Sequence, residues 1–289
     1  MEHPYDRCPE DSGNIIAFEH LNTRVPDQHL ATIFYLTGLG LTRDPYMMPH
    51  VTNMWVNIGS SQFHLPTGSP QILGGHVGVI VPSHEALRKR MESVEPLLEG
   101  TRYEARETRQ YIELTSPWGN VYRCFEASAE PGSVLLGVMY VQQDVAVGSA
   151  AGIARFYREV LGARADVVDD GEGVTAHVAI GSGQTLRFHE KTGSLPPFDG
   201  VHVAIYLSDF SRPYRWLLER DLLTEESGQH QYRFQTIMDT ESSEALAVLE
   251  HEVRSLKHPF YGRQLINRDV SQTSRHYVPG SDNFNCRRT

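Results

Sequence analysis

The sequence predicts an α+β protein built from four strand-helix-strand-strand-strand (βαβββ) modules that pair into two domains. Three observations lead to this prediction. Short segments alternate polar and apolar residues at the two-residue period of strands. Single stretches with helical spacing separate groups of these strands, and the second half of the chain repeats the first. A chain of 289 residues also has the length typical of two domains.

The first half holds two modules, which we place in a domain spanning residues 14–128 after a flexible lead at 1–13. In the first module Asp27 is placed to cap a helix, and in the second Ser83 does the same. Glycine- and proline-rich turns separate the strands that follow each helix. The predicted strands of this half lie at 15–25, 53–58, 62–65, 76–81, 103–106, 111–115 and 121–126.

The second half repeats these patterns at a nearly fixed distance. Phe34-Tyr35 recurs as Phe156-Tyr157, 122 residues later, and His76-Val77 recurs as His202-Val203, 126 residues later. Small insertions in the loops of a duplicated fold produce such a drift. The chain therefore divides into a linker at 129–134, a second two-module domain at 135–268 and a polar tail at 269–289. In the last module we expect a long strand at 245–256, a turn at 258–262 and a closing strand at 263–267.

Composition limits the classes of partner. The net charge is −10 and basic residues form no long run, which argues against nucleic acid and anionic membranes. No apolar run approaches the roughly 20 residues that span a bilayer, and the polar N-terminus does not resemble a signal peptide. We therefore expect a cytoplasmic protein that binds a small-molecule substrate, with self-association left open. The three cysteines have neither disulfide-framework nor zinc-site spacing.

Histidines on separate strands are the first candidates for chemistry. His20 and His76 occupy equivalent places on two predicted strands, each six residues before a proline, and His64 shares a strand face with Gln62. Three imidazoles on one concave face would hold a divalent Fe, Mn, Zn or Ni ion, with the Gln62 carbonyl as an alternative ligand or substrate contact. Alternatively, these histidines are packed or hydrogen-bonded parts of the fold.

The motifs resemble those of a known family. Val-Pro-Asp at the end of a strand (25–27), Phe-Tyr-x-x-x-Leu-Gly (34–40) and Ser-Pro-x-Gly-Asn (116–120) are similar to the vicinal oxygen chelate superfamily. That superfamily includes glyoxalase I, methylmalonyl epimerases, type I extradiol dioxygenases and bleomycin-resistance proteins. The resemblance implies a glyoxalase-like cupped sheet in each domain, with a divalent metal on its floor. Four modules in one chain are most similar to the extradiol dioxygenase arrangement.

In that family the ligands come from the first and last strands of the modules. In the first domain these positions are His20, Gln62 or His64, His76, and Arg123 in place of a glutamate. Because arginine has no lone pair, it cannot ligate a metal. We expect Arg123 to pair with Glu113 or with a substrate carboxylate, which gives these two residues the predicted catalytic roles.

The second domain departs further from the dioxygenase pattern. Its corresponding positions are Tyr140, Arg187 or His189, His202, and residues 265–267, which include no carboxylate. We interpret Tyr140, His189 and His202 as substrate contacts or structural residues. Glu250 and Glu252 share a strand face, where a solvated edge is the simpler interpretation and a general base the alternative.

These observations predict a metal-dependent enzyme acting on a small oxygenated substrate. Isomerase, lyase and dioxygenase chemistry all fit stabilisation of an enolate-like anion by the metal. The alternative is a metal-free protein that sequesters a small molecule, as the drug-resistance members do, and Arg123 in place of a carboxylate favours it.

Overall fold

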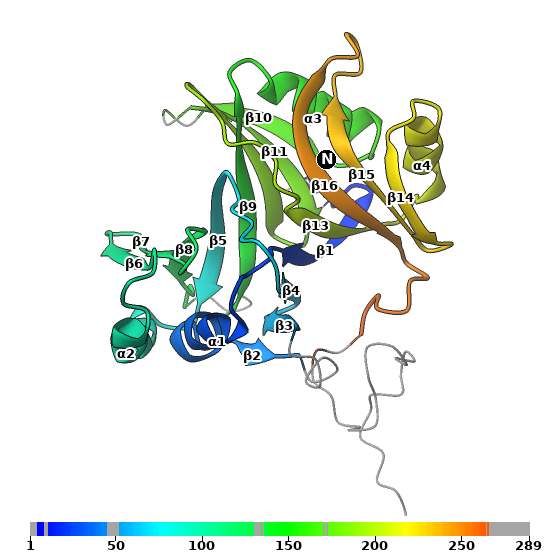
Figure 1. Cartoon of the computed structure of the whole chain (residues 1–289). Helices are drawn as coiled ribbons and strands as arrows, with labels where there is room; N and C mark the ends of the chain where they lie inside the picture. Colours follow the sequence, from blue (N-terminus) through cyan, green and yellow to red (C-terminus); the bar gives the residue numbers. More distant parts are fainter. Residues whose placement is uncertain are drawn as a thin grey trace, which may run out of the picture. The chain divides into compact units, whose positions relative to one another are not determined.

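The structure, a computed structural model, describes residues 5–8, 11–44, 52–129, 134, 136–169, 171, 173–263 and 265 (Figure 1). The predicted tail lies outside this part of the chain, as does most of the predicted linker. Four βαβββ modules follow one another, and the α+β fold class is confirmed. The described chain forms two compact units: residues up to Phe18 with 140–198 and 203–256, and residues 19–139 with 199–202 and those from Lys257 onward.

Each of the first two modules contains four strands and one main helix. In the first, Asp27 Oδ1 accepts hydrogen bonds from the backbone amides of His29 and Leu30, so it caps the helix as predicted. Ser83 caps the second through the amide of Ala86. The elements are β1 (Ile15–Asn22), α1 (Gln28–Ala31) continuing as the π-helical segment η2 (Thr32–Gly38), β2 (Thr42–Arg43), β3 (Asn53–Ile58), β4 (Ser61–Pro66), β5 (Gly75–Val81), α2 (His84–Val94), the 3-10 turn η4 (Glu95–Leu97), β6 (Glu104–Glu107), β7 (Tyr111–Thr115) and β8 (Val121–Glu126).

The other two modules follow the same order. Their elements are β9 (Gly137–Ala146), α3 (Ala150–Glu159), β10 (Ala165–Asp169), β11 (Val174–Gly181), β12 (Gln184–Lys191), β13 (His202–Leu207), α4 (Ser211–Leu218), β14 (Leu223–Gly228), β15 (Gln231–Met238) and β16 (Ala245–Ser255). The long strand predicted at 245–256 is confirmed as β16. The closing strand predicted at 263–267 is wrong for its described residues, since Arg263 follows a turn and lies outside any strand.

Every module has the same strand order, in which the first strand lies beside the last. The pairing is parallel for β1 with β4, for β5 with β8 and for β9 with β12. In each module the last strand also pairs antiparallel with the strand that precedes it in the sequence. Together the strands form two eight-stranded sheets, as the glyoxalase-like prediction requires.

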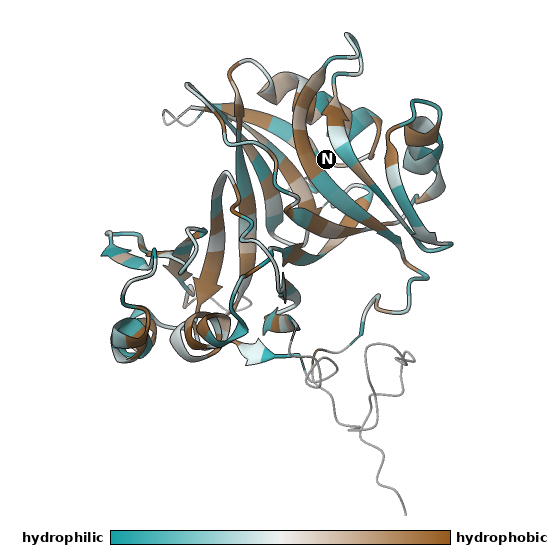
Figure 2. Cartoon of the chain, in the orientation of Figure 1, coloured by the Kyte–Doolittle hydropathy of each residue, from teal (hydrophilic) through white to brown (hydrophobic). Residues whose placement is uncertain are grey.

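The repeated Phe-Tyr pair has the same structural role in both halves of the chain. Phe34, Tyr35, Phe156 and Tyr157 are all fully buried, and the two tyrosines contact Phe63 on β4 and Phe188 on β12. Figure 2 shows hydrophobic and hydrophilic residues alternating along many of the strands, as expected when the two faces of a sheet differ in burial. No helix among the described residues is long and apolar enough to cross a membrane.

Candidate metal centre

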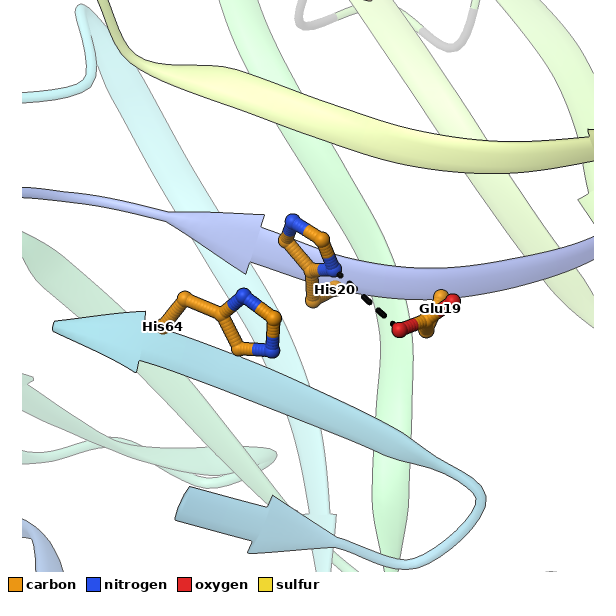
Figure 3. Close-up of side chains that lie close together, drawn as sticks. All are labelled: Glu19, His20 and His64. Carbon is orange, nitrogen blue, oxygen red and sulfur yellow. Dashed lines mark ion pairs between the residues drawn. The ribbon is translucent and has the colours of Figure 1, made fainter. Parts of the chain in front are cut away.

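Two predicted ligands lie together on the neighbouring strands β1 and β4. His20 stands opposite Gln62 in the parallel register, and the ring of His64 stacks on that of His20 with 3.6 Å between centroids and 19° between planes. Trp55, the register partner of His64 on β3, stacks on the other ring face at 3.9 Å and 7°. His64 is therefore held between two flat rings. Figure 3 shows His20 on β1 and His64 on β4.

A third imidazole reaches His20 from the start of β13. The Nε2 atoms of His20 and His202 are 3.4 Å apart, and both residues belong to the same compact unit. Both side chains are buried. An N···N distance of 3.4 Å is long for a hydrogen bond. It equals the separation of about 3.4 Å expected for two nitrogens that each bind a tetrahedral ion at about 2.1 Å.

The other ring nitrogen of His20 faces a carboxylate. His20 Nδ1 is 3.6 Å from Glu19 Oε1 (Figure 3), and it has no hydrogen-bond partner within the described chain. A carboxylate attracts the proton of a neutral imidazole to the nearer nitrogen, which leaves the lone pair on Nε2. Metal-binding histidines commonly have a carboxylate behind them in this way.

The donor set fits a divalent transition metal. Glu19, His20 and His64 form one group whose possible ligand atoms lie within 4.8 Å of one another, and His20 and His202 belong to a second such group, which does not contain His64. Imidazole nitrogens suit Zn, Fe, Ni and Cu, and carboxylate oxygens extend the set to harder ions. The buried, unpartnered Nδ1 of His20 is the atom that a metal-bound ring would turn toward its supporting carboxylate.

Gln62 is engaged by the protein through its whole amide. Its Nε2 donates to Asp44 Oδ2 at 2.5 Å and to Asn57 Oδ1 at 2.6 Å. Its Oε1 lies 3.0 Å from His64 Nε2 and accepts from Arg263 Nη2 at 3.2 Å. Both lone pairs of the carbonyl oxygen are therefore in use. The geometry gives Gln62 a role in orienting His64 and leaves it unsuited to the ligand and substrate-binding roles that the sequence predicted.

His76 does not join the cluster. It lies on β5, which belongs to a different sheet from β1 and β4. Neither of the close groups of histidine and acidic side chains among the described residues contains it. The analogy between His20 and His76 holds for the module pattern, since both lie on first strands. It misled the ligand prediction because equivalent strands of two modules lie in different sheets.

Arg123 and Glu113 form the structural pair that the sequence suggested. They are register partners on β8 and β7, and Arg123 Nε donates to Glu113 Oε2 at 3.1 Å. Glu113 also accepts from Arg106 at 2.9 Å, and the Arg123 guanidinium lies 5.0 Å from the Tyr111 ring centre. Glu113 therefore pairs with one arginine on each neighbouring strand and stabilises the edge of its sheet.

The remaining predicted contacts lie in the other unit. Tyr140 is buried under the guanidinium of Arg187, which lies 3.8 Å from the ring centre. His189 Nδ1 is 2.9 Å from Thr175 Oγ1 on the neighbouring strand. Both arrangements are consistent with packing, so the substrate-binding roles of Tyr140 and His189 stay predictions.

The last strand of the fourth module, β16, carries two carboxylates, those of Glu250 and Glu252. This strand was predicted at 263–267, where there is no acid, whereas the last strand of the described residues is β16. On β16, Glu252 is buried and ion-paired with Arg233 and with Arg254, the latter at 2.5 Å. Glu250 pairs with Arg233 and accepts from Gln235 at 3.0 Å. The solvated edge expected for these glutamates is therefore wrong.

Sequence reasoning missed several residues around the cluster. Glu19 precedes His20 directly and would have emerged from a search for acids beside histidines. Trp55 would have emerged from the strand register. Asp44 and Arg263 left no local signal, because they meet only through the fold, 219 residues apart in the sequence.

Comparisons with known proteins agree on the fold. No model of a known protein family matches the chain, and no curated protein matches its sequence. Solved structures do match, and they show that the chain has a glyoxalase-like fold. Glyoxalase I from Zea mays is similar with a TM-score of 0.58 and 14% identity, covering 86% of this chain and 94% of the other. A "putative dioxygenase" from Bacillus subtilis is similar with a TM-score of 0.55 and 15% identity, covering 87% of each chain.

Proposed function

We propose that this protein is a metal-dependent enzyme of the vicinal oxygen chelate type that acts on a small oxygenated substrate. The observation that carries the proposal is the approach of His20 and His202 through their Nε2 atoms to 3.4 Å in a buried site. The fold supports it, since the similar structures include a glyoxalase I and a protein described as a dioxygenase. The reaction is of the isomerase, lyase or dioxygenase class.

In this proposal His20 and His202 hold a divalent metal through Nε2, and His64 stacks on the ring of His20 and supports its orientation. A bound metal would polarise a substrate oxygen and stabilise an enolate-like anion. Glu19 orients His20 from behind through Nδ1. Trp55 and the stacked rings shield one side of the site from water, which strengthens electrostatic interactions there.

Metal analysis of protein purified with and without added Fe, Mn, Zn and Ni tests the proposal. We expect about one tightly bound ion per chain in the wild type, and its loss in His20→Ala and His202→Ala. His189→Ala is the matched control, because His189 contacts Thr175 on a neighbouring strand and lies outside the cluster. His64→Ala measures the contribution of the ring that stacks on His20.

The outcomes separate the two functional classes. Folded wild-type protein that binds none of these metals would contradict the enzyme proposal and favour a metal-free binding protein. Equal metal retention in His20→Ala and His189→Ala would show that the ion binds elsewhere.

A further inference from the structure

The segment that follows β16 packs onto β3 and β4 of its own compact unit. Two turns shape it, with the Tyr261 amide donating to the His258 carbonyl at 2.9 Å and the Arg263 amide to the Phe260 carbonyl at 3.2 Å. The Phe260 ring meets Trp55 edge-on at 5.9 Å. The Arg263 guanidinium lies 5.1 Å from the centre of the Phe260 ring. Residues 258–262 were predicted as a turn before a final strand, with the aromatic pair and Arg263 as a possible rim of the second cup.

Arg263 is anchored by a buried ion pair. Its Nη2 donates to Asp44 Oδ2 at 2.7 Å, and the two side chains are 4% and 0% exposed. The same Nη2 donates to Gln62 Oε1 at 3.2 Å. Asp44 Oδ2 accepts from both Arg263 and Gln62, so the guanidinium holds the carboxylate in place as an acceptor for the Gln62 amide.

An acceptor at Asp44 decides which way the Gln62 amide points. The NH₂ group of Gln62 must face Asp44, where it donates at 2.5 Å, and it also donates to Asn57 Oδ1. The carbonyl oxygen must then face Arg263 and His64. The hydrogen-bond partners therefore determine which end of the Gln62 amide is the oxygen and which is the nitrogen.

We infer that Arg263 is a positioning residue that selects the tautomer of His64. Because the Gln62 oxygen accepts, His64 Nε2 carries the proton and donates to it at 3.0 Å. The lone pair of the neutral ring then lies on Nδ1. Four residues from distant parts of the chain act in series: Arg263 fixes Asp44, Asp44 fixes Gln62, and Gln62 fixes His64. The inference rests on the proposed function only through the place of His64, whose ring stacks on His20, and it defines which nitrogen of His64 carries the proton.

Removing the guanidinium weakens this order. The Gln62 carbonyl oxygen loses the donor that faces it, and Asp44 loses its ion pair. The Gln62 amide then populates both orientations, and the one that turns its NH₂ group toward His64 places the ring proton on Nδ1. Arg263→Met makes this change with a side chain of similar length. Arg263→Lys keeps a cation beside Asp44 and is the conservative variant.

Nitrogen-15 NMR of the histidine rings tests the inference directly. Long-range ¹H–¹⁵N correlation spectra of labelled protein, recorded with a chelator present, distinguish a protonated ring nitrogen from one with a lone pair. The His64 signals are assigned by their loss in His64→Asn. We expect protonated Nε2 in the wild type and Arg263→Lys, and a mixture of protonated Nε2 and protonated Nδ1 in Arg263→Met. Arg187→Met, which removes a guanidinium from the other unit, should leave His64 unchanged.

Two results would overturn the inference: protonated Nδ1 in the wild type, or an unchanged tautomer in folded Arg263→Met. If Arg263→Met does not fold, Asp44→Asn serves instead, since an asparagine can donate to Gln62; a mixture of His64 tautomers is expected, and a single unchanged tautomer contradicts the inference. The spectra need no metal. Failure of the proposed metal site therefore shows as lost metal binding with the tautomer intact, and failure of this inference shows as the reverse.

Discussion

The buried pair of Tyr157 and His251 makes the stability of its unit sensitive to acid. The Tyr157 hydroxyl donates to His251 Nε2 at 2.6 Å, and His251 Nδ1 donates to the Leu249 carbonyl at 2.7 Å. Phe234 stacks on the imidazole at 4.3 Å and 5°. Both members of the pair are 0% exposed. Burial lowers the pKa of His251 from 6.5 to about 4, although its hydrogen bond to the Leu249 carbonyl opposes the shift.

The sign of the effect follows from which state binds the proton. Between pH 6.5 and about 4, the unfolded chain protonates His251 and the folded chain does not. The free energy of unfolding therefore falls as the pH falls through this window. A difference of 2.5 pKa units, at about 1.4 kcal/mol per unit, corresponds to about 3 kcal/mol in total. At pH 5 about 2 kcal/mol of this is already lost.

Urea unfolding at pH 7, 6 and 5 measures this loss. The reference is the double variant Tyr157→Phe/His251→Phe, which keeps ring volume and removes both polar partners, so that it stays near wild-type stability at pH 7. Trp216 packs against Phe156 in the same unit and reports its unfolding by fluorescence. We expect the wild type to lose about 2 kcal/mol more than the double variant between pH 7 and 5. Parallel pH profiles for the two proteins would refute the reasoning.

Two further predictions concern backbone positions. Gly59 has a φ of +63°, and an added Cβ would lie 2.1 Å from the Leu136 carbonyl oxygen, whereas Gly183 has a φ of +69° with nothing within 4 Å among the described residues. Gly59→Ala should therefore lower the free energy of unfolding by at least about 1 kcal/mol more than Gly183→Ala in urea titrations, and equal losses would contradict the predicted close contact. Asp27→Ala should cost about 1 kcal/mol by removing the cap of α1, which thermal unfolding can measure against Asp27→Asn, a variant that retains a capping oxygen.

The module pattern was predictable because it depends on local sequence. The caps Asp27 and Ser83 and the repeated Phe-Tyr pairs each leave a signal within a few residues. Two strands of the fourth module, β14 and β15, were missed. β14 is an edge strand whose residues are mostly exposed and polar, so the alternation that reveals a half-buried strand is absent.

The candidate site was predictable only in part. His20 and His64 were identified because both lie on strands of one module, which pair in a fixed register. Residues that reach the site from elsewhere, such as His202 and Arg263, could not be placed by spacing. Their positions depend on how strands of different modules assemble and on where the chain goes after β16. His76 was wrongly predicted as a ligand because the sequence shows that β1 and β5 are equivalent strands but does not show that they lie in different sheets.

X-ray absorption spectroscopy of the zinc-loaded protein tests the central claim most directly, because multiple scattering from imidazole rings counts histidine ligands at the metal. The account predicts at least two imidazoles in the wild type, one fewer or complete loss of the ion in His202→Ala, and no change in His189→Ala. A spectrum without imidazole scattering, or the same count in wild type and His202→Ala, would contradict the metal centre formed by His20 and His202.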